Sequence, residues 1–303
     1  MSTAPKPRCH DREVAPRELG ILSPEFIVGG NAINTISILG SGWLGLPLAE
    51  RFVTQGYRLK VSTTSPERLS TLAALPGEAC IVDISKPLDN IDAFLQSDTL
   101  IVNITSKDID GFERLVRKIE ASGIQAVLFV SSTSVYPVNC KVVSEAVGEE
   151  SPDHPLVIIE NLFRQSGQFR MTIVRFAGLI GGSRHPGRFF RGGKMVKNPD
   201  AKVNLIHRDD CINILDRIVA NDLWGETFNA CADSHPSKRE FYTQAAKMAG
   251  VPLPDFEDSD DGSFKIIDNS KLKRVLGYEF LHPDLMAIRF DENSIKGHGG
   301  IKK

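Results

Sequence analysis

Three glycines, Gly40, Gly42 and Gly45, have the spacing of a phosphate-binding turn. They follow a β-branched run at 35–39 and precede a segment with helical patterning, which is the context that a Gly-x-Gly-x-x-Gly turn requires. The first glycine permits the tight turn, the second leaves room for a pyrophosphate, and the third lets the helix pack closely on the strand. A chance cluster in a chain with 25 glycines is the alternative. The residues expected to contact a dinucleotide here are Gly40, Ser41, Gly42, Trp43, Leu44 and Gly45.

The segment after the second expected strand indicates which dinucleotide would bind. NAD-selective sites place an acidic residue about 20 residues beyond the glycines, where it hydrogen-bonds the ribose 2′-hydroxyl. Here the strand ends in Thr63 and Thr64, with Arg68 nearby, and these groups could accept a 2′-phosphate. The same segment could simply cap the next helix. Asp83 follows a short apolar strand and would meet the adenine edge or form a turn. We predict NADP in preference to NAD.

Alternating strands and helices would position these residues. The expected strands are 35–39, 58–62, 79–82, 98–102, 125–130, 171–174, 203–206 and 227–229, and the expected helices are 43–55, 66–75, 109–122, 154–166, 209–220, 237–249 and 271–276. The runs at 100–102 and 126–130 are continuously apolar, which is typical of strands with helices on both faces. The pattern predicts an α/β fold with a Rossmann-type doubly wound parallel sheet and ligands at the carboxyl ends of the strands.

Three regions are expected along the chain. Residues 1–34 are rich in proline and interleaved charge, which indicates a flexible N-terminal extension. Acidic residues interrupt this segment, so it lacks the character of a secretory signal or a mitochondrial presequence. Residues 35–175 would form the NAD(P)-binding core. Residues 176–303 would mainly form a small C-terminal substrate lobe, with some elements returning to the core.

Composition limits the classes of partner and the compartment. The formal net charge is −2 and charges of both signs are interspersed, so no global field favours nucleic acid or a membrane surface. No apolar run approaches the roughly 18 residues needed to cross a bilayer. Five cysteines without a Cys-x-x-Cys pair indicate a reducing compartment, and we expect a cytoplasmic protein. His207 with Cys211, and Cys231 with His235, could ligate a metal, but their apolar context favours buried thiols and no metal.

Several motifs together carry a family resemblance. They are 39–48 (LGSGWLGLPL), 131–136 (SSTSVY), 175–179 (RFAGL), 184–190 (RHPGRFF), 203–207 (VNLIH) with Asp210, and 225–229 (GETFN). With these motifs the chain resembles the extended and atypical short-chain dehydrogenase/reductases, the NAD-dependent epimerase/dehydratase family, and in particular its bacterial YeeZ-like branch. The resemblance covers residues 35 to about 283. It implies a Rossmann core, a nicotinamide cofactor and a small-molecule substrate.

The same resemblance assigns a role to Ser132, whose hydroxyl would hydrogen-bond the reacting oxygen of the substrate. In the family it assists a tyrosine that acts as acid or base and is followed four residues later by a lysine. Here the residues four places after the four tyrosines are Val61, Cys140, Ala246 and His282. The Tyr-x-x-x-Lys pair is therefore absent, and segment 153–160 has neither a phenol nor an amine. The resemblance thus implies an atypical active site.

Two residues could supply the missing proton transfer. Tyr136 lies four residues after Ser132, although in the family this tyrosine mainly supports the loop after the strand. His154 is the imidazole nearest to the segment that normally carries the catalytic pair, and its ordinary pKa of about 6.5 suits acid-base work. A solvent-facing histidine beside Pro155 is the alternative.

The Gly- and Arg-rich loop at 178–193 gathers cations in the region that forms the substrate lobe in relatives. Guanidinium groups bind phosphate or carboxylate through paired hydrogen bonds, so Arg184, His185 and Arg188 are candidate ligands of an anionic substrate. A solvated basic loop is the alternative.

These observations predict an NAD(P)-binding oxidoreductase or epimerase-like enzyme acting on a small polar or anionic, nucleotide-sugar-like substrate. Loss of the catalytic pair supports a second hypothesis, a cofactor-binding sensor or regulatory protein without turnover. We expect no nucleic-acid or membrane partner. The oligomeric state stays open, a homodimer included.

Overall fold

The computed structural model describes residues 34–139, 141–146, 148–190, 194–257 and 263–290. The predicted N-terminal extension and most of the acidic stretch at 257–261 lie outside the described residues.

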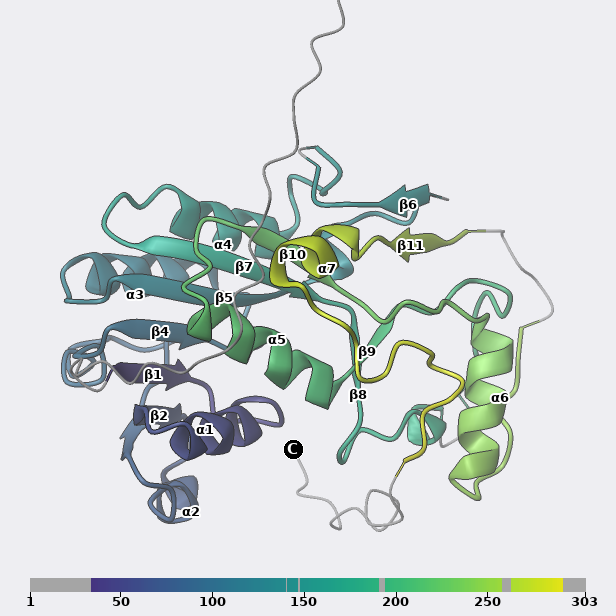
Figure 1. Cartoon of the computed structure of the whole chain (residues 1–303), viewed down its shortest axis with the longest axis horizontal. Helices are drawn as coiled ribbons and strands as arrows, with labels where there is room; N and C mark the ends of the chain where they lie inside the picture. Colours follow the sequence, from purple (N-terminus) through teal and green to yellow (C-terminus); the bar gives the residue numbers. More distant parts are fainter. Residues whose placement is uncertain (1–33, 140, 147, 191–193, 258–262, 291–303) are drawn as a thin grey trace, which may run out of the picture. The chain divides into compact units, whose positions relative to one another are not determined.

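A seven-stranded parallel sheet organises the chain (Figure 1). Its strands, in spatial order, are β3 (Glu78–Ile81), β2 (Arg58–Thr63), β1 (Thr35–Leu39), β4 (Thr99–Val102), β5 (Ala126–Ser132), β7 (Arg170–Phe176) and β10 (Thr227–Ala230). The strand order runs outward in opposite directions from the boundary between β1 and β4. In doubly wound sheets, ligands bind at this reversal point, outside the carboxyl ends of the strands. The sheet confirms the predicted fold class.

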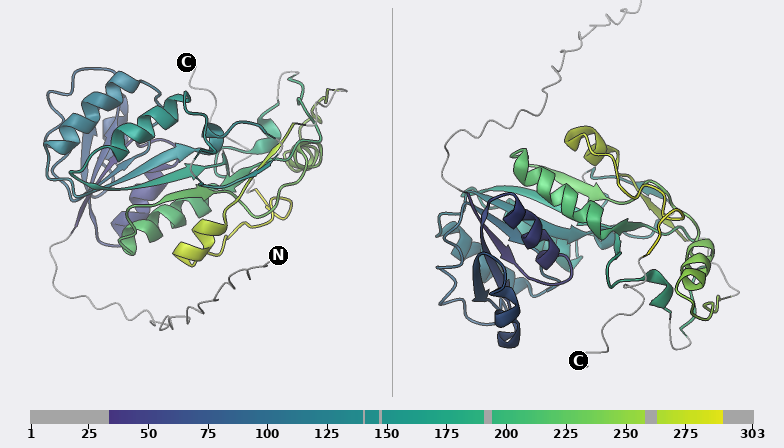
Figure 2. Two further views of the ribbon diagram at one scale, coloured as in Figure 1. Left: turned by 90° about the horizontal axis from the view of Figure 1, so that it is seen from above. Right: turned by 60° about the horizontal axis from the view of Figure 1, so that its bottom comes forward.

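Helices cover both faces of the sheet (Figures 1 and 2). On one face lie α1 (Gly45–Thr54) and α5 (Arg208–Ala220), and on the other lie α3 (Ile109–Glu120) and α4 (Pro155–Arg164). Because the inner strands are buried from both sides, their consecutive residues pack into different cores. Ile38 packs toward α1 and α5, whereas Leu39 packs toward α3 and α4.

Between β7 and β10 the chain leaves the sheet. It forms β8 (Gly178–Ile180), the 3₁₀ turn η3 (Pro186–Arg188), β9 (Leu205–His207) and α5 before it returns at Thr227. A separate apolar cluster forms beyond the sheet, and its buried members are Ile180, Val203, Leu205, Ala232, Phe241, Leu285 and Ile288. Helix α6 (Lys238–Met248) packs there on η3, and α7 (Ser270–Leu276) contacts β10.

Short elements differ from the sequence-based expectations. Strands β6 (Lys141–Val143) and β11 (Lys265–Ile267) pair in parallel, as do β8 and β9, and three of these four were not predicted. The expected helix at 66–75 is a 3₁₀ turn, η1 (Pro66–Arg68), followed by a single helical turn, α2 (Leu69–Leu72). Within the described residues, no helix combines the length and apolar character that a membrane crossing requires.

Candidate functional site

A pocket of about 550 Å³ opens where the strand order reverses, at the carboxyl ends of β1 and β4. Its walls come from the loop after β1, the ends of β2 and β3, the loop after β4, and two residues beyond β7. The lining residues are Leu39, Gly40, Ser41, Gly42, Trp43, Leu44, Ser62, Thr63, Thr64, Arg68, Val82, Asp83, Ile84, Ser85, Asn103, Ile104, Thr105, Ser106, Leu179 and Arg184. Apart from Gly45, every residue that we assigned to the dinucleotide from the sequence lies in this lining.

The three glycines of the loop meet different surroundings. Gly40 has φ +104°, and a Cβ there would lie 2.4 Å from the backbone oxygen of Asn103. A Cβ on Gly45 would lie 1.9 Å from the oxygen of Gly40. Gly42, in contrast, has no protein atom within 4 Å of the position that a Cβ would take. Protein packing therefore explains the first and third glycines, and the second borders the open pocket.

Hydrogen bonds hold the glycine loop against its neighbours. The amide of Gly40 donates to the hydroxyl of Ser62 (3.0 Å), and Asn103 donates through Nδ2 to the oxygen of Gly40 (3.3 Å). Arg68 donates from Nη2 to the oxygen of Ser41 (2.8 Å). Ser41 belongs to the pocket lining but is only 2% exposed, and its buried hydroxyl has no hydrogen-bond partner within the described residues.

Asn103 was not selected from the sequence. Its position directly after the apolar strand β4 is the signal that could have identified it, because side chains at the carboxyl ends of parallel strands gather at one edge of the sheet.

Asp83 both lines the pocket and forms a turn. Its Oδ1 accepts hydrogen bonds from the amide (3.1 Å) and the hydroxyl (2.7 Å) of Ser85. The hydrogen bond from the Ser85 hydroxyl is the main reason that the pKa of Asp83 lies below its ordinary value. Forming a turn therefore does not remove Asp83 from the pocket, where the sequence suggested contact with the adenine edge.

Ser132 ends β5, the strand next to β4. Its hydroxyl accepts a hydrogen bond from the amide of Ser134 (3.1 Å) and begins the 3₁₀ turn η2 (Thr133–Val135). The side chain is half-buried and is not part of the pocket lining. Ser132 is therefore one strand away from the glycine loop pocket.

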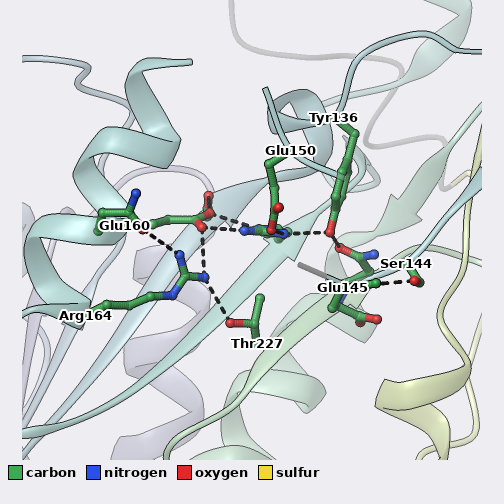
Figure 3. A network of polar contacts seen from close by, with 12 residues as sticks. Tyr136, Ser144, Glu145, Glu150, Glu160, Arg164 and Thr227 are labelled. Atoms are coloured by element: carbon green, nitrogen blue, oxygen red, sulfur yellow. Dashed lines mark hydrogen bonds and ion pairs between the residues drawn. The ribbon is translucent and has the colours of Figure 1, made fainter. Parts of the chain in front are cut away.

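Tyr136 lies in a buried polar network and not in the pocket. The residue is 2% exposed, its hydroxyl donates to Oδ1 of Asn229 (2.8 Å), and Arg175 donates to it from Nη1 (2.7 Å). Figure 3 shows the phenol pointing into this network. Burial raises the pKa of Tyr136 to about 12, against an opposing effect of the Arg175 charge. This placement favours the supporting role over proton transfer.

The centre of the network is the pair of Arg175 and Glu160, both fully buried. Nε and Nη2 of Arg175 donate to the two carboxylate oxygens at 3.0 and 2.6 Å. Arg175 also pairs with Glu150 (2.6 Å), and Arg164 approaches Glu160 at 3.1 Å. Burial alone would lower the pKa of Arg175, but hydrogen bonds from its guanidinium to Glu160 raise it instead. The network joins β7 to α4 through charges that are matched inside the protein.

His154 is the N-cap of α4, and its Nδ1 accepts a hydrogen bond from the amide of Leu156 (3.2 Å). Burial and the positive charge of Lys107 lower its pKa. Lys265, which sequence reasoning missed, donates from Nζ to the backbone oxygens of Thr133 (3.0 Å) and Tyr136 (2.6 Å). This lysine connects β11 to the turn that follows Ser132.

The cationic loop residues are separated in the structure. Arg184 lines the pocket, and its guanidinium carbon lies 4.5 Å from the centroid of the Trp43 ring. His185 is 1% exposed, accepts a hydrogen bond from the amide of Gly187 (3.1 Å), and lies against the ring of Phe290 at a tilt of 42°. Arg188 is half-buried and does not line the pocket. Of the three predicted substrate ligands, only Arg184 reaches this pocket.

Comparison with known proteins gives the family. Protein YeeZ of Escherichia coli strain K12 is 30% identical over 273 residues, which are 84% of this chain and 98% of the relative. The chain belongs to the YeeZ family. No protein-family model matches it.

Solved structures similar to this YeeZ-family chain share its fold. A functionally unknown conserved protein from Silicibacter pomeroyi superposes with a TM-score of 0.70 at 21% identity, covering 84% of this chain and 95% of that one. UDP-glucuronic acid 4-epimerase from Bacillus cereus, solved in complex with NAD, superposes with a TM-score of 0.68 at 17% identity, covering 86% and 98%. The relative confirms the resemblance to the YeeZ branch, and the solved structures confirm the fold.

The candidate metal ligands have other surroundings in this YeeZ-family protein. Cys211 and Cys231 are fully buried, and burial raises the pKa of the Cys231 thiol to about 12. Among the described residues, His207, Asp209 and His282 bring ligand atoms within 4.8 Å of one another. Nδ1 of His207 already accepts a hydrogen bond from the amide of Asp209 (3.3 Å) as the N-cap of α5.

Proposed function

We propose that the pocket at the carboxyl ends of β1 and β4 binds NAD(P). The observation that carries this proposal is the place of the glycine loop in the pocket lining: protein packing accounts for Gly40 and Gly45, whereas Gly42 borders the pocket and leaves room there for a ligand. Ser41, whose buried hydroxyl is unpaired among the described residues, and the N-terminus of α1 belong to the same loop, beside which a pyrophosphate would sit. A volume of about 550 Å³ suits a ligand of this class.

NADP is proposed as the preferred form. The end of β2 contributes Thr63, Thr64 and, just beyond, Arg68 to the lining, and none of these is acidic. A carboxylate there would hydrogen-bond the ribose 2′-hydroxyl of NAD and repel a 2′-phosphate, whereas a guanidinium accommodates the phosphate.

We infer that the protein is an oxidoreductase or epimerase-like enzyme. The B. cereus epimerase with the same fold was solved with UDP-glucuronic acid and NAD together, which supports a small polar or anionic, nucleotide-sugar-like substrate here. When bound, a nicotinamide accepts or donates a hydride. The hydroxyl of Ser132 would hydrogen-bond the reacting oxygen of the substrate, and His154 would move the proton.

A specific observation favours a second candidate function, a cofactor-binding sensor without turnover. The Tyr-x-x-x-Lys pair is absent from the sequence, and the hydroxyl of Tyr136 is engaged by Arg175 and Asn229. A protein of this kind would bind NAD(P) and never oxidise the reduced form.

The first experiment titrates the full chain and the Gly42→Ala variant with NADPH, NADH, NADP and NAD. Nicotinamide fluorescence and thermal shift report binding. Saturable binding that favours the phosphorylated pair and is lost in Gly42→Ala is expected. No binding of any of the four would refute both candidate functions. If binding is present, oxidation of NADPH during a screen of UDP-sugars and small anionic carbonyl compounds separates the enzyme from the sensor.

A further inference from the structure

We propose that Arg184 is a ligand of the cofactor diphosphate, delivered to the glycine loop from the segment beyond the sheet, and not a ligand of the substrate. This inference rests on the proposed function, because it concerns the same pocket. It changes the role that the sequence suggested for Arg184.

The backbone that carries Arg184 is a fixed tight turn. Gly181 and Arg184 exchange backbone hydrogen bonds of 3.2 and 3.0 Å, and Gly181 and Gly182 have φ +99° and +50°. A Cβ on Gly181 would lie 2.3 Å from Nε2 of His207, and one on Gly182 would lie 2.5 Å from Nη1 of Arg208. The turn therefore packs tightly on the start of α5, and Arg184 is presented from a pre-organised support.

The side chain of Arg184 reaches across to the glycine loop. Its guanidinium carbon is 4.5 Å from the ring centroid of Trp43, which directly follows Gly42. A cation held over an indole ring in this way keeps N–H groups available for a planar or tetrahedral anion. Arg184 is exposed, and no carboxylate forms an ion pair with it in the part of the chain that the structure describes.

The charges around the pocket indicate which anion Arg184 would meet. Among the lining residues, the charged ones are Arg68, Asp83 and Arg184. Arg68 already donates to the oxygen of Ser41 and lies beside Thr63 and Thr64, at the proposed ribose end. Arg184 is the lining cation at Trp43, on the side of the glycine loop toward α1, where a diphosphate with two negative charges would lie. Arg208 also approaches the Trp43 ring, at 5.6 Å, but it pairs with Asp209 at 4.0 Å and does not line the pocket.

A phosphate contact from Arg184 would have a structural consequence. The glycine loop belongs to the sheet, whereas Arg184 belongs to the segment that leaves the sheet after β7. Binding of the dinucleotide would therefore join these two parts of the protein through one side chain.

The test measures binding of ADP-ribose, NADPH and adenosine to the full chain, to Arg184→Ala and to Arg184→Lys by isothermal titration at low and high salt. The control is Arg239→Ala, which removes a guanidinium stacked on the ring of Phe256 (4.7 Å) far from the pocket lining. Arg184→Ala should weaken ADP-ribose and NADPH about 10- to 100-fold and reduce the salt dependence of their affinity. Arg184→Lys should recover part of the loss, and adenosine should bind all variants equally.

A second readout uses the indole itself. In a Trp224→Phe background, Trp43 is the remaining tryptophan, and ADP-ribose should change its emission in the presence of Arg184 more than in Arg184→Ala. Equal affinity of the parent protein and Arg184→Ala for ADP-ribose would overturn the inference, as would a loss confined to a UDP-sugar. Failure of the parent protein to bind ADP-ribose or NADPH would instead refute the proposed function itself.

Discussion

The backbone oxygen of Gly40 lies where a side chain on Gly45 would begin, 1.9 Å from the position of a Cβ. Helix α1 can start this close to the end of β1 only because residue 45 has no side chain. The same crowding does not extend to Gly42, which faces the pocket. Gly45 therefore has a role in the fold, whereas Gly42, three residues earlier, has a role beside the proposed ligand.

Alanine at these two positions should separate folding from binding. Gly42→Ala should keep the unfolding free energy of the parent protein, because its Cβ meets no protein atom, and should abolish saturable NADPH binding. Gly45→Ala should lose about 1–3 kcal/mol of stability through overpacking. Urea unfolding and nicotinamide fluorescence measure the two effects. Normal NADPH affinity in Gly42→Ala would contradict the assignment of the pocket.

Removing one partner of the buried ion pair should be costly. Glu160→Gln leaves the guanidinium of Arg175 buried with its main counter-charge gone, and we expect a loss of about 3–5 kcal/mol in the unfolding free energy. The matched control is Glu113→Gln, which breaks an exposed pair with Arg117 (3.0 Å) and should cost less than about 1 kcal/mol. Similar urea midpoints for both variants would show that the buried network contributes little.

Tyr136→Phe should affect stability and not binding. The variant leaves Oδ1 of Asn229 and Nη1 of Arg175 without their phenolic partner, which we expect to cost about 1–3 kcal/mol. NADPH affinity should stay at the parent value, because Tyr136 is not part of the pocket lining. A variant with parent stability but impaired turnover on an identified substrate would restore Tyr136 as a proton donor.

His154 should make stability depend on pH in a defined direction. Burial lowers its pKa in the folded state below the ordinary value of about 6.5, so the unfolded chain binds more protons between the two values. The contribution to stability is then complete above about pH 6.5 and is lost as the pH falls through that window. His154→Asn retains an N-cap acceptor without a titrating ring and should flatten this part of the profile. Urea midpoints measured between about pH 5 and 7 compare the two proteins.

Arg68→Ala should change the choice of cofactor. We expect NADPH affinity to fall about 10-fold more than NADH affinity, because the guanidinium would pair with the 2′-phosphate. Some loss for both is expected, since Arg68 also holds the oxygen of Ser41. Arg58→Ala, at the opposite end of β2, should leave both affinities unchanged. An equal loss of NADPH and NADH would argue against NADP selectivity through Arg68.

The strands and helices of the central sheet could be predicted because each is marked by the pattern of its own consecutive residues. The strand expected at 35–39 coincides with β1. The helix expected at 109–122 is α3, which ends at Glu120, two residues earlier than predicted. Strands of three residues, such as β6 and β11, show no period and were missed. They form only because segments more than a hundred residues apart in the chain pair in parallel.

The site residues also fall into two groups, those recognisable from contiguous sequence and those that only the fold brings together. The glycine loop is contiguous in sequence and could be recognised, whereas Asn103 reaches Gly40 from 63 residues away. Sequence proximity placed Tyr136 near Ser132 but did not reveal that its hydroxyl turns toward Arg175, 39 residues later. His185 lies in a cationic segment that reads as exposed, yet its ring is buried against Phe290.

The late return of β10 to the sheet has a consequence for synthesis on the ribosome. Strand β7 has emerged long before Thr227–Ala230, so a nascent chain holds an unpaired edge along Ile173–Phe176 while the intervening segment is translated. An unpaired strand edge of this kind can pair with strands from other chains. A fragment that stops short of residue 227 should therefore aggregate, and in the finished sheet the edge passes from β7 to β10, which α7 contacts.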